Sequence, residues 1–105
     1  MKKGSLFAVA ENLQQVWKSQ LLGAVGDTKV KVLKMGGDGI PPETHADFDE
    51  MLIVLEGELP LVVDGVRHHL VAGDFFLVPK GLSHHVPAGS AGILLIIDRQ
   101  ARPEC

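Results

Sequence analysis

The sequence predicts an all-β fold, a sandwich or barrel of short strands, with one short helix near the N-terminus. Two observations carry this prediction. Short apolar segments recur along the chain, and turn residues separate them at intervals of about 8 to 12 residues. Asp64-Gly65 stands between two such segments, and an Asp-Gly pair there is a strong hairpin signal because both residues tolerate positive φ.

The helix is expected over Leu13–Gln20, with Asn12 as its N-cap. Leu13, Val16 and Trp17 recur there at the i, i+3 and i+4 spacing, which gives the segment one apolar face. We expect no other helix of note.

The expected strands share short apolar or alternating patterns. They are Thr28–Met35, Met51–Leu55, Leu59–Val63, Val66–Leu70, Phe75–Val78 and Ile93–Ile97. Lysine and valine alternate over residues 29–32 as in a half-buried strand, and Leu33 to Met35 indicates a bulge or a register shift. The glycine- and proline-rich residues 36–42 are predicted to form a loop, and Gly57 is predicted to end a strand.

Composition limits the classes of partner. The 105 residues suit a single domain, residues 1–105, and the net charge of -3 gives no general attraction to nucleic acid or anionic lipid. There is no run of about 18 apolar residues, as a membrane-spanning helix would need. Cys105 is the only cysteine, so no intrachain disulfide can form. We expect a soluble, cytoplasmic protein whose partners are small molecules or other proteins.

One group of polar residues follows a regular spacing after the glycine-rich loop. Five residues separate Gly37 from Glu43, one separates Glu43 from His45, four separate His45 from Glu50, and six separate Glu50 from Gly57. Because residues two apart on a strand point the same way, Glu43 and His45 are expected to share a face.

A second group is spaced as regularly. Five residues separate Gly73 from Pro79, one separates Pro79 from Gly81, two separate Gly81 from His84, and three separate His84 from Ala88. The two groups, residues 37–57 and 73–88, resemble the two motifs of the cupin family, with a short stretch of fifteen residues between them. The segment 49–57 also resembles small cupins described as mannose-6-phosphate-isomerase-like. The resemblance covers about half of the chain and implies a double-stranded β-helix, the jelly-roll barrel of cupins.

The resemblance also implies a metal site in the mouth of the barrel. Carried over residue by residue, His45, Glu50 and His84 bind one divalent ion of Fe, Mn, Zn or Ni. Glu43 stands where the family has a histidine and is a conditional fourth ligand, and Ala88 stands where the family has an asparagine that supports the fold. Two carboxylates would neutralise the ion and favour harder metals such as Mn(II) or Fe(II) over copper.

Plainer interpretations stay open. The mouth can be empty, and Glu43 can be a solvated acid that follows two prolines. His85 is expected to point away from the site, and His68 and His69 lack the spacing of a ligand. Asp47 and Asp49 are expected to be solvated loop acids, although Asp47 could reach across the mouth.

The sequence leaves two functions open. One is a metal-dependent enzyme acting on a small organic molecule, as an oxygenase or an isomerase. The isomerase version lacks an evident base, because tyrosine is absent and Lys80 lies in a turn. The other is a binding module that senses or stores a small ligand or metal.

Cupins of this size usually pair, so a homodimer is expected. The tail from Gln100 to Cys105 is expected to fray.

Overall fold

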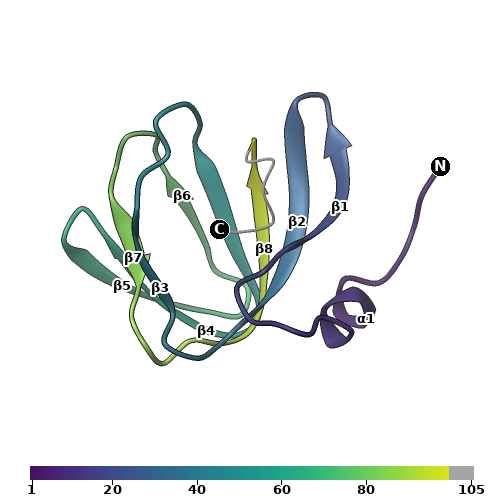
Figure 1. Cartoon of the computed structure of the whole chain (residues 1–105), viewed down its shortest axis with the longest axis horizontal. Helices are drawn as coiled ribbons and strands as arrows, with labels where there is room; N and C mark the ends of the chain where they lie inside the picture. Colours follow the sequence, from purple (N-terminus) through teal and green to yellow (C-terminus); the bar gives the residue numbers. More distant parts are fainter. Residues whose placement is uncertain (100–105) are drawn as a thin grey trace.

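The structure is a computed structural model that describes residues 1–99, and antiparallel strands build almost all of it. The elements, in chain order, are α1 (Leu6–Glu11), β1 (Gln20–Val25), β2 (Thr28–Met35), β3 (Ile40–Glu43), β4 (Glu50–Val63), β5 (Val66–Val71), β6 (Phe75–Val78), β7 (His84–Val86) and β8 (Ala91–Asp98). Hydrogen bonds join the strands in the order β1-β2-β8-β4-β7-β3, and β5 and β6 also pair with β4. The sheet curls into a barrel, with β3, β5 and β7 facing β2 across its interior (Figure 1). The all-β prediction with one short N-terminal helix is therefore confirmed.

The 14-residue strand β4 is the centre of the barrel, because it pairs with β5, β6, β7 and β8. Its hairpin with β5 turns at Asp64 and Gly65, both at positive φ, as predicted. Gly57, however, lies within β4 instead of ending a strand. It pairs with Gly92 at φ +84°, and a Cβ there would lie 2.0 Å from the carbonyl oxygen of Ala91. Glycine is needed at this position because the backbones of β4 and β8 meet there.

The predicted helix over Leu13–Gln20 is wrong. The helix lies earlier, in α1, where the side chain of Ser5 accepts a hydrogen bond from the first turn. Trp17 departs from helical geometry with φ +61°. Its backbone N–H donates to Lys34 O over 2.8 Å and its indole Nε1 donates to Gly36 O over 2.9 Å. These bonds to the end of β2 outweigh the local helical pattern and pack Trp17 into the barrel core.

Strand β2 corrects two further predictions. Its register with β8 is continuous, so there is no bulge in that pairing at Leu33 to Met35. The strand is also not half-buried, as the alternation of residues 29–32 predicts: Lys31 is 2% exposed and lies on the inner side with Leu33, while Val32 lies on the outer side against Ala10 of α1. The lysine and valine positions are therefore on the opposite faces from those the alternation suggests.

Three strands were not predicted, β1, β3 and β7. The prolines of β3 are tolerated because β3 is at the edge of the sheet, where a missing N–H breaks no ladder. Strand β7 is only three residues long, so its sequence carries little periodic signal. These strands are defined by their pairing partners more than by their own composition.

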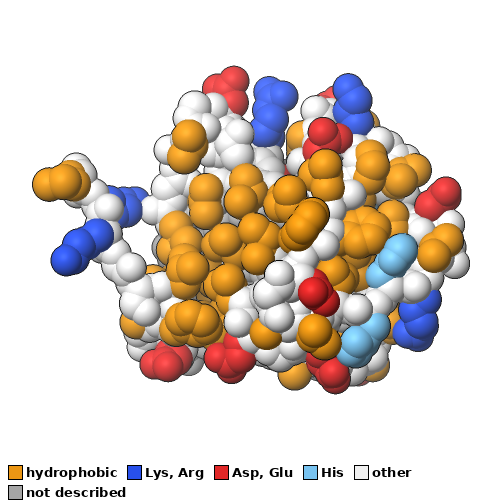
Figure 2. Space-filling view, turned by 180° about the vertical axis from the view of Figure 1, so that it is seen from behind, with side chains coloured by type: hydrophobic (Ala, Val, Ile, Leu, Met, Phe, Trp, Pro, Cys, Tyr) orange, Lys and Arg blue, Asp and Glu red, His pale blue; other side chains and the backbone are white. Residues whose placement is uncertain are grey.

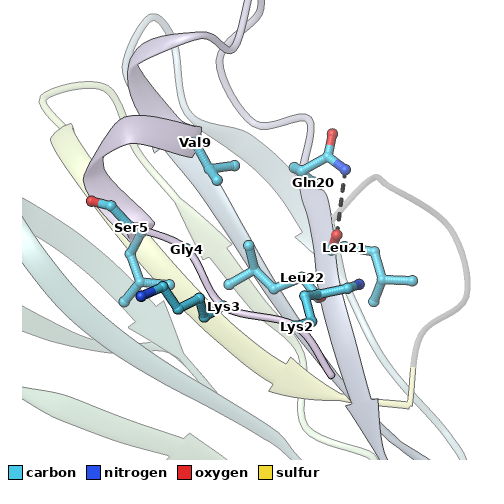
Figure 3. A pocket seen from close by; sticks show the side chains of 9 residues that line it. Lys2, Lys3, Gly4, Ser5, Val9, Gln20, Leu21 and Leu22 are labelled. Atoms are coloured by element: carbon cyan, nitrogen blue, oxygen red, sulfur yellow. Dashed lines mark hydrogen bonds between the residues drawn. The ribbon is translucent and has the colours of Figure 1, made fainter.

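The N-terminal segment runs beside β1 and encloses a groove of about 410 Å³ (Figure 3). Lys2 Nζ donates to Leu22 O over 2.8 Å and ties the segment to the strand. Among the described residues, no helix is long and apolar enough to cross a membrane. The tail predicted to fray, residues 100–105, lies outside the described part of the chain.

Candidate metal centre

The four predicted ligands come from three neighbouring strands and one loop. Glu43 ends β3, Glu50 begins β4 and His84 begins β7, while His45 lies in the loop between β3 and β4. Glu43 pairs directly with His84 across β3 and β7. Two sequence motifs that are far apart along the chain are thus brought to one end of the barrel.

The side chains of these four residues, which we call the Glu/His cluster, converge on one point. One ligand atom of each lies within 4.8 Å of the others. His84 Nε2 is 3.3 Å from Glu43 Oε1 and 3.4 Å from Glu50 Oε1. His45 Nε2 is 3.6 Å from Glu43 Oε1 and 3.6 Å from Glu50 Oε2. Donor atoms held by one ion at about 2.0–2.2 Å lie roughly 3–4.4 Å apart, so the spacing is close to the one an ion requires.

The cluster contains polar atoms that the described chain does not satisfy. Within residues 1–99, Glu43 Oε1, His45 Nε2, Glu50 Oε2 and His84 Nε2 are buried and form no hydrogen bond. Burying such atoms without partners costs about 1–3 kcal/mol each. A divalent cation would satisfy all four at once, and nitrogen and carboxylate oxygen are the donors that Fe, Mn, Ni and Zn accept. The residues present therefore fit a metal ion.

Charge in the cluster is strongly perturbed. Burial lowers the pKa of His84, but contacts with the carboxyl groups of Glu43 and Glu50 outweigh it and raise the pKa to about 10. Burial is also the main cause that raises the pKa of Glu50. His84 and His45 lower this pKa in part, and Asp98 raises it. Without a metal the cluster therefore retains protons, which an entering cation must displace.

Backbone contacts hold the two histidines in place. His84 Nδ1 lies 3.3 Å from Leu82 O, a contact in which Nδ1 donates and Nε2 is left to face the carboxylates. The carbonyl of His45 accepts a hydrogen bond from the backbone N–H of Gly81 over 2.8 Å, and its ring stacks on Phe48 with centroids 4.7 Å apart. The two loops that carry the histidines are thus joined to each other.

Asp49, the residue before Glu50, also links the two loops that carry the histidines. Its Oδ1 accepts the backbone N–H of Lys80 over 2.9 Å. We had expected a solvated acid here, so its role in linking the loops was missed. Asp47 is exposed, as expected for a loop acid.

The other histidines lie outside the cluster. His68 packs against Phe76 with ring centroids 4.7 Å apart, and the exposed His69 lies 3.5 Å from Glu58. His85 is half-buried beside Val62, one position from His84 and so on the other face of β7. Among the described residues, none of these three histidines belongs to the Glu/His cluster.

The interior behind the cluster is almost filled. A cavity of about 10 Å³ lies next to Glu50 and His84, enough for about one water molecule, and Trp17 is in its lining. The rest of the lining is apolar and consists of Ile40, Leu52, Leu59, Leu61, Val86 and Leu94. On the other side, the side chain of Glu43 is 26% exposed. A ligand larger than water therefore approaches the cluster from the side of Glu43.

Sequence reasoning missed two charged residues beside the cluster. Lys31 Nζ lies 2.8 Å from Asp98 Oδ1, and both side chains are almost completely buried. The only signal in the sequence was a lysine and an aspartate within strands. By composition alone, charged residues there are expected to face solvent.

Comparison with known proteins agrees with the fold. The family model of the cupin domain matches residues 29–98, two thirds of the chain. This chain belongs to the cupin domain family, and the jelly-roll prediction is confirmed.

Individual relatives and solved structures are similar to this chain. A cupin-2 domain protein from Shewanella frigidimarina is 30% identical with a TM-score of 0.76, covering 87% of this chain and 85% of that chain. A presumptive mannose-6-phosphate isomerase from Ralstonia eutropha is 22% identical with a TM-score of 0.75, covering 96% and 100%, and at that identity it shows the fold alone. Quercetin 2,3-dioxygenase of Bacillus subtilis is 41% identical over 54 residues, which are 50% of this chain but only 16% of that enzyme.

Proposed function

We propose that this cupin holds one divalent metal ion through Glu43, His45, Glu50 and His84 and acts with it on a small organic molecule. The observation that carries the proposal is the convergence of four buried donor atoms within 4.8 Å, none hydrogen-bonded in the described chain. A metal bound there would supply Lewis acidity or, for iron, a site for oxygen. The ligand set leaves positions open for such chemistry.

The proposed metal is Mn(II) or Fe(II), with Ni(II) and Zn(II) as alternatives. Two carboxylates neutralise a divalent cation, and carboxylate oxygens favour harder ions over copper. The two neutral imidazoles are compatible with each of these ions.

Oxygenase chemistry is favoured over isomerase chemistry. An isomerase needs a base beside the substrate, but the chain has no tyrosine, and the backbone of Lys80 is held in the loop by Asp49. The partial likeness to a dioxygenase points the same way. Quercetin itself is not the proposed substrate, because the cavity of about 10 Å³ cannot admit a flavonol behind the cluster.

The alternative is a non-catalytic module that binds a small ligand or the metal alone. The nearly filled interior favours it, since enzymes of small organic molecules usually enclose most of the substrate in a cavity of several hundred Å³. Oxygen consumption by the metal-loaded protein with candidate substrates separates the two functions. A ligand that raises the melting temperature without turnover supports the module.

The deciding experiment is elemental analysis of untagged protein purified without chelator, together with His84→Ala, Glu43→Ala and the matched control His85→Ala. We expect about one metal per chain in the wild type and in His85→Ala, and loss of it in His84→Ala. If Glu43→Ala retains the metal, the ion is bound by His45, Glu50 and His84 alone. If the wild-type protein stays metal-free after reconstitution with Mn(II), Fe(II), Ni(II) and Zn(II), the proposal of a metal site is wrong.

We further propose that the chain forms a homodimer through the outer face of the barrel. Hydrophobic side chains gather on the rear face of the molecule (Figure 2). Among the outward residues of β6, Phe75 is 67% and Leu77 is 48% exposed, and they pair with the half-buried Ile53 and Met51 of β4. An apolar face of this kind usually marks an interface.

A further inference from the structure

A buried ion pair lies beside the Glu/His cluster. Lys31 Nζ is 2.8 Å from Asp98 Oδ1, and the side chains are 3% and 0% exposed. Lys31 is the only buried lysine or arginine among residues 1–99. Taking two charges out of water costs several kcal/mol per ion, and an apolar pair of the same volume would often stabilise a fold equally well. Stability alone is therefore a weak reason for this pair.

The strand register places the pair directly next to Glu50. Ile97 of β8 is opposite Met51 of β4, so the following residue, Asp98, is level with Glu50. Glu50 and Asp98 are 1% and 3% exposed, and both lie on the inner face, as does Lys31 on β2. Asp98 is close enough to Glu50 to help raise the pKa of the Glu50 carboxyl. The three side chains therefore form a row across β2, β8 and β4 that ends at the cluster.

The order of charge along this row matters for a cation. Asp98 stands between Lys31 and Glu50, so the negative end of the pair faces Glu50 and the metal position beyond it. A fixed negative charge behind a carboxylate ligand repels it toward the metal position and raises its basicity, which increases its donor strength toward a metal. Lys31 balances the charge of Asp98, which allows Glu43, Glu50 and Asp98 to be close together in one partly buried region.

We propose that Asp98 and Lys31 are positioning residues for the metal ligand Glu50. Asp98 directs the carboxylate of Glu50 toward the cluster and strengthens it as a donor, and Lys31 keeps Asp98 in place. The inference rests on the proposed metal site and extends it to two residues that lie outside the cupin motifs.

The test uses the affinity for Mn(II) as the probe, with the melting temperature of the metal-free protein measured in parallel. Asp98→Asn keeps the shape and removes the charge. Without that charge Glu50 is no longer directed toward the metal position and is a weaker donor, so we expect the Kd for Mn(II) to rise by about 10- to 100-fold. Asp27→Asn removes the same charge in the exposed turn between β1 and β2 and should leave the Kd within about twofold of wild type.

A second variant keeps the test decisive if Asp98→Asn folds poorly. Lys31→Met with Asp98→Leu replaces the whole pair by apolar side chains of similar size, a change that is often neutral or stabilising for a fold. We expect this double variant to melt close to wild type but to bind Mn(II) at least about tenfold more weakly.

The outcomes separate the two proposals. A wild type that binds Mn(II) and a double variant with an unchanged Kd would mean that the pair only fills the core, and the inference would be overturned while the metal site stands. A wild type that binds neither Mn(II) nor the other candidate ions would overturn both.

Discussion

His84 links the two carboxylates of the cluster, and its protonation governs the metal-free protein. Its pKa is raised from 6.5 to about 10, so the folded chain holds this proton more tightly than the unfolded chain does. The resulting stability is fully present below pH 6.5 and is lost as the pH rises through about 10. The raised pKa of Glu50 acts in the same direction, because its proton too is favoured in the folded state.

We therefore predict that the free energy of unfolding of metal-free protein falls between pH 6 and 9.5, by on the order of a few kcal/mol. Urea denaturation at a series of pH values measures it. His84→Ala should flatten the profile, while His85→Ala, on the other face of β7, should keep the wild-type slope. A flat wild-type profile would show that His84 is neutral in the apoprotein.

Single residues also show what the sequence could and could not predict about the site. His45, Glu50, His84 and Glu43 were found because their spacing follows family motifs, and the structure brings all four together. Lys31 was missed because the side to which a strand residue points depends on register, and a shift by one residue exchanges the two faces. In β2 both faces are covered, the outer one by α1, so the alternation of lysine and valine carried no reliable information about the barrel interior.

At the scale of elements, local signals were predictive and non-local ones were not. The hairpin of β4 and β5 was predicted because two turn residues specify it. The helix was misplaced because Trp17 gains two hydrogen bonds from the end of β2, a segment far away in the sequence. Strands β1, β3 and β7 were not predicted for the related reason that their partners, and not their own residues, define them.

The crossing of β4 and β8 gives a prediction about Gly57. Gly57→Ala combines positive φ with a Cβ 2.0 Å from the carbonyl oxygen of Ala91, a backbone atom that cannot move away cheaply. We expect a loss of about 2–5 kcal/mol in the free energy of unfolding, the sum of left-handed strain of about 1–2 kcal/mol and overpacking of about 1–3 kcal/mol.

Gly65 provides the matched control. Its φ of +77° is close to that of Gly57, but no atom lies within 4 Å of a Cβ built there. Gly65→Ala should therefore show only the strain, about 1–2 kcal/mol. Equal losses for the two variants in urea denaturation would mean that β8 moves aside and that the close approach does not constrain the barrel.

At the scale of the whole molecule, the sheet has two apolar faces and only one of them encloses the barrel core. Helix α1 covers part of the outer face, where Ala10 packs with Val32 and Ile93. The part over β4 and β6 stays uncovered, with Phe75 and Leu77 the most exposed of its side chains. Antiparallel sheets usually place polar residues on a face that stays in water. This face is instead suited to a second copy of the chain.

We predict that wild-type protein at micromolar concentration has twice the 11.3 kDa mass of one chain in light scattering after size exclusion. Phe75→Glu with Leu77→Glu should yield monomers, because two buried and unpaired carboxylates would cost several kcal/mol at the interface. Val66→Glu introduces the same charge at a 56% exposed position on β5, outside this face, and should leave the dimer intact. If the double variant stays dimeric while Val66→Glu dissociates, the interface lies at the β4–β5 hairpin. The Glu/His cluster belongs to a single chain, so monomers should retain their metal, and loss of metal on dissociation would mean that the partner chain supports the site.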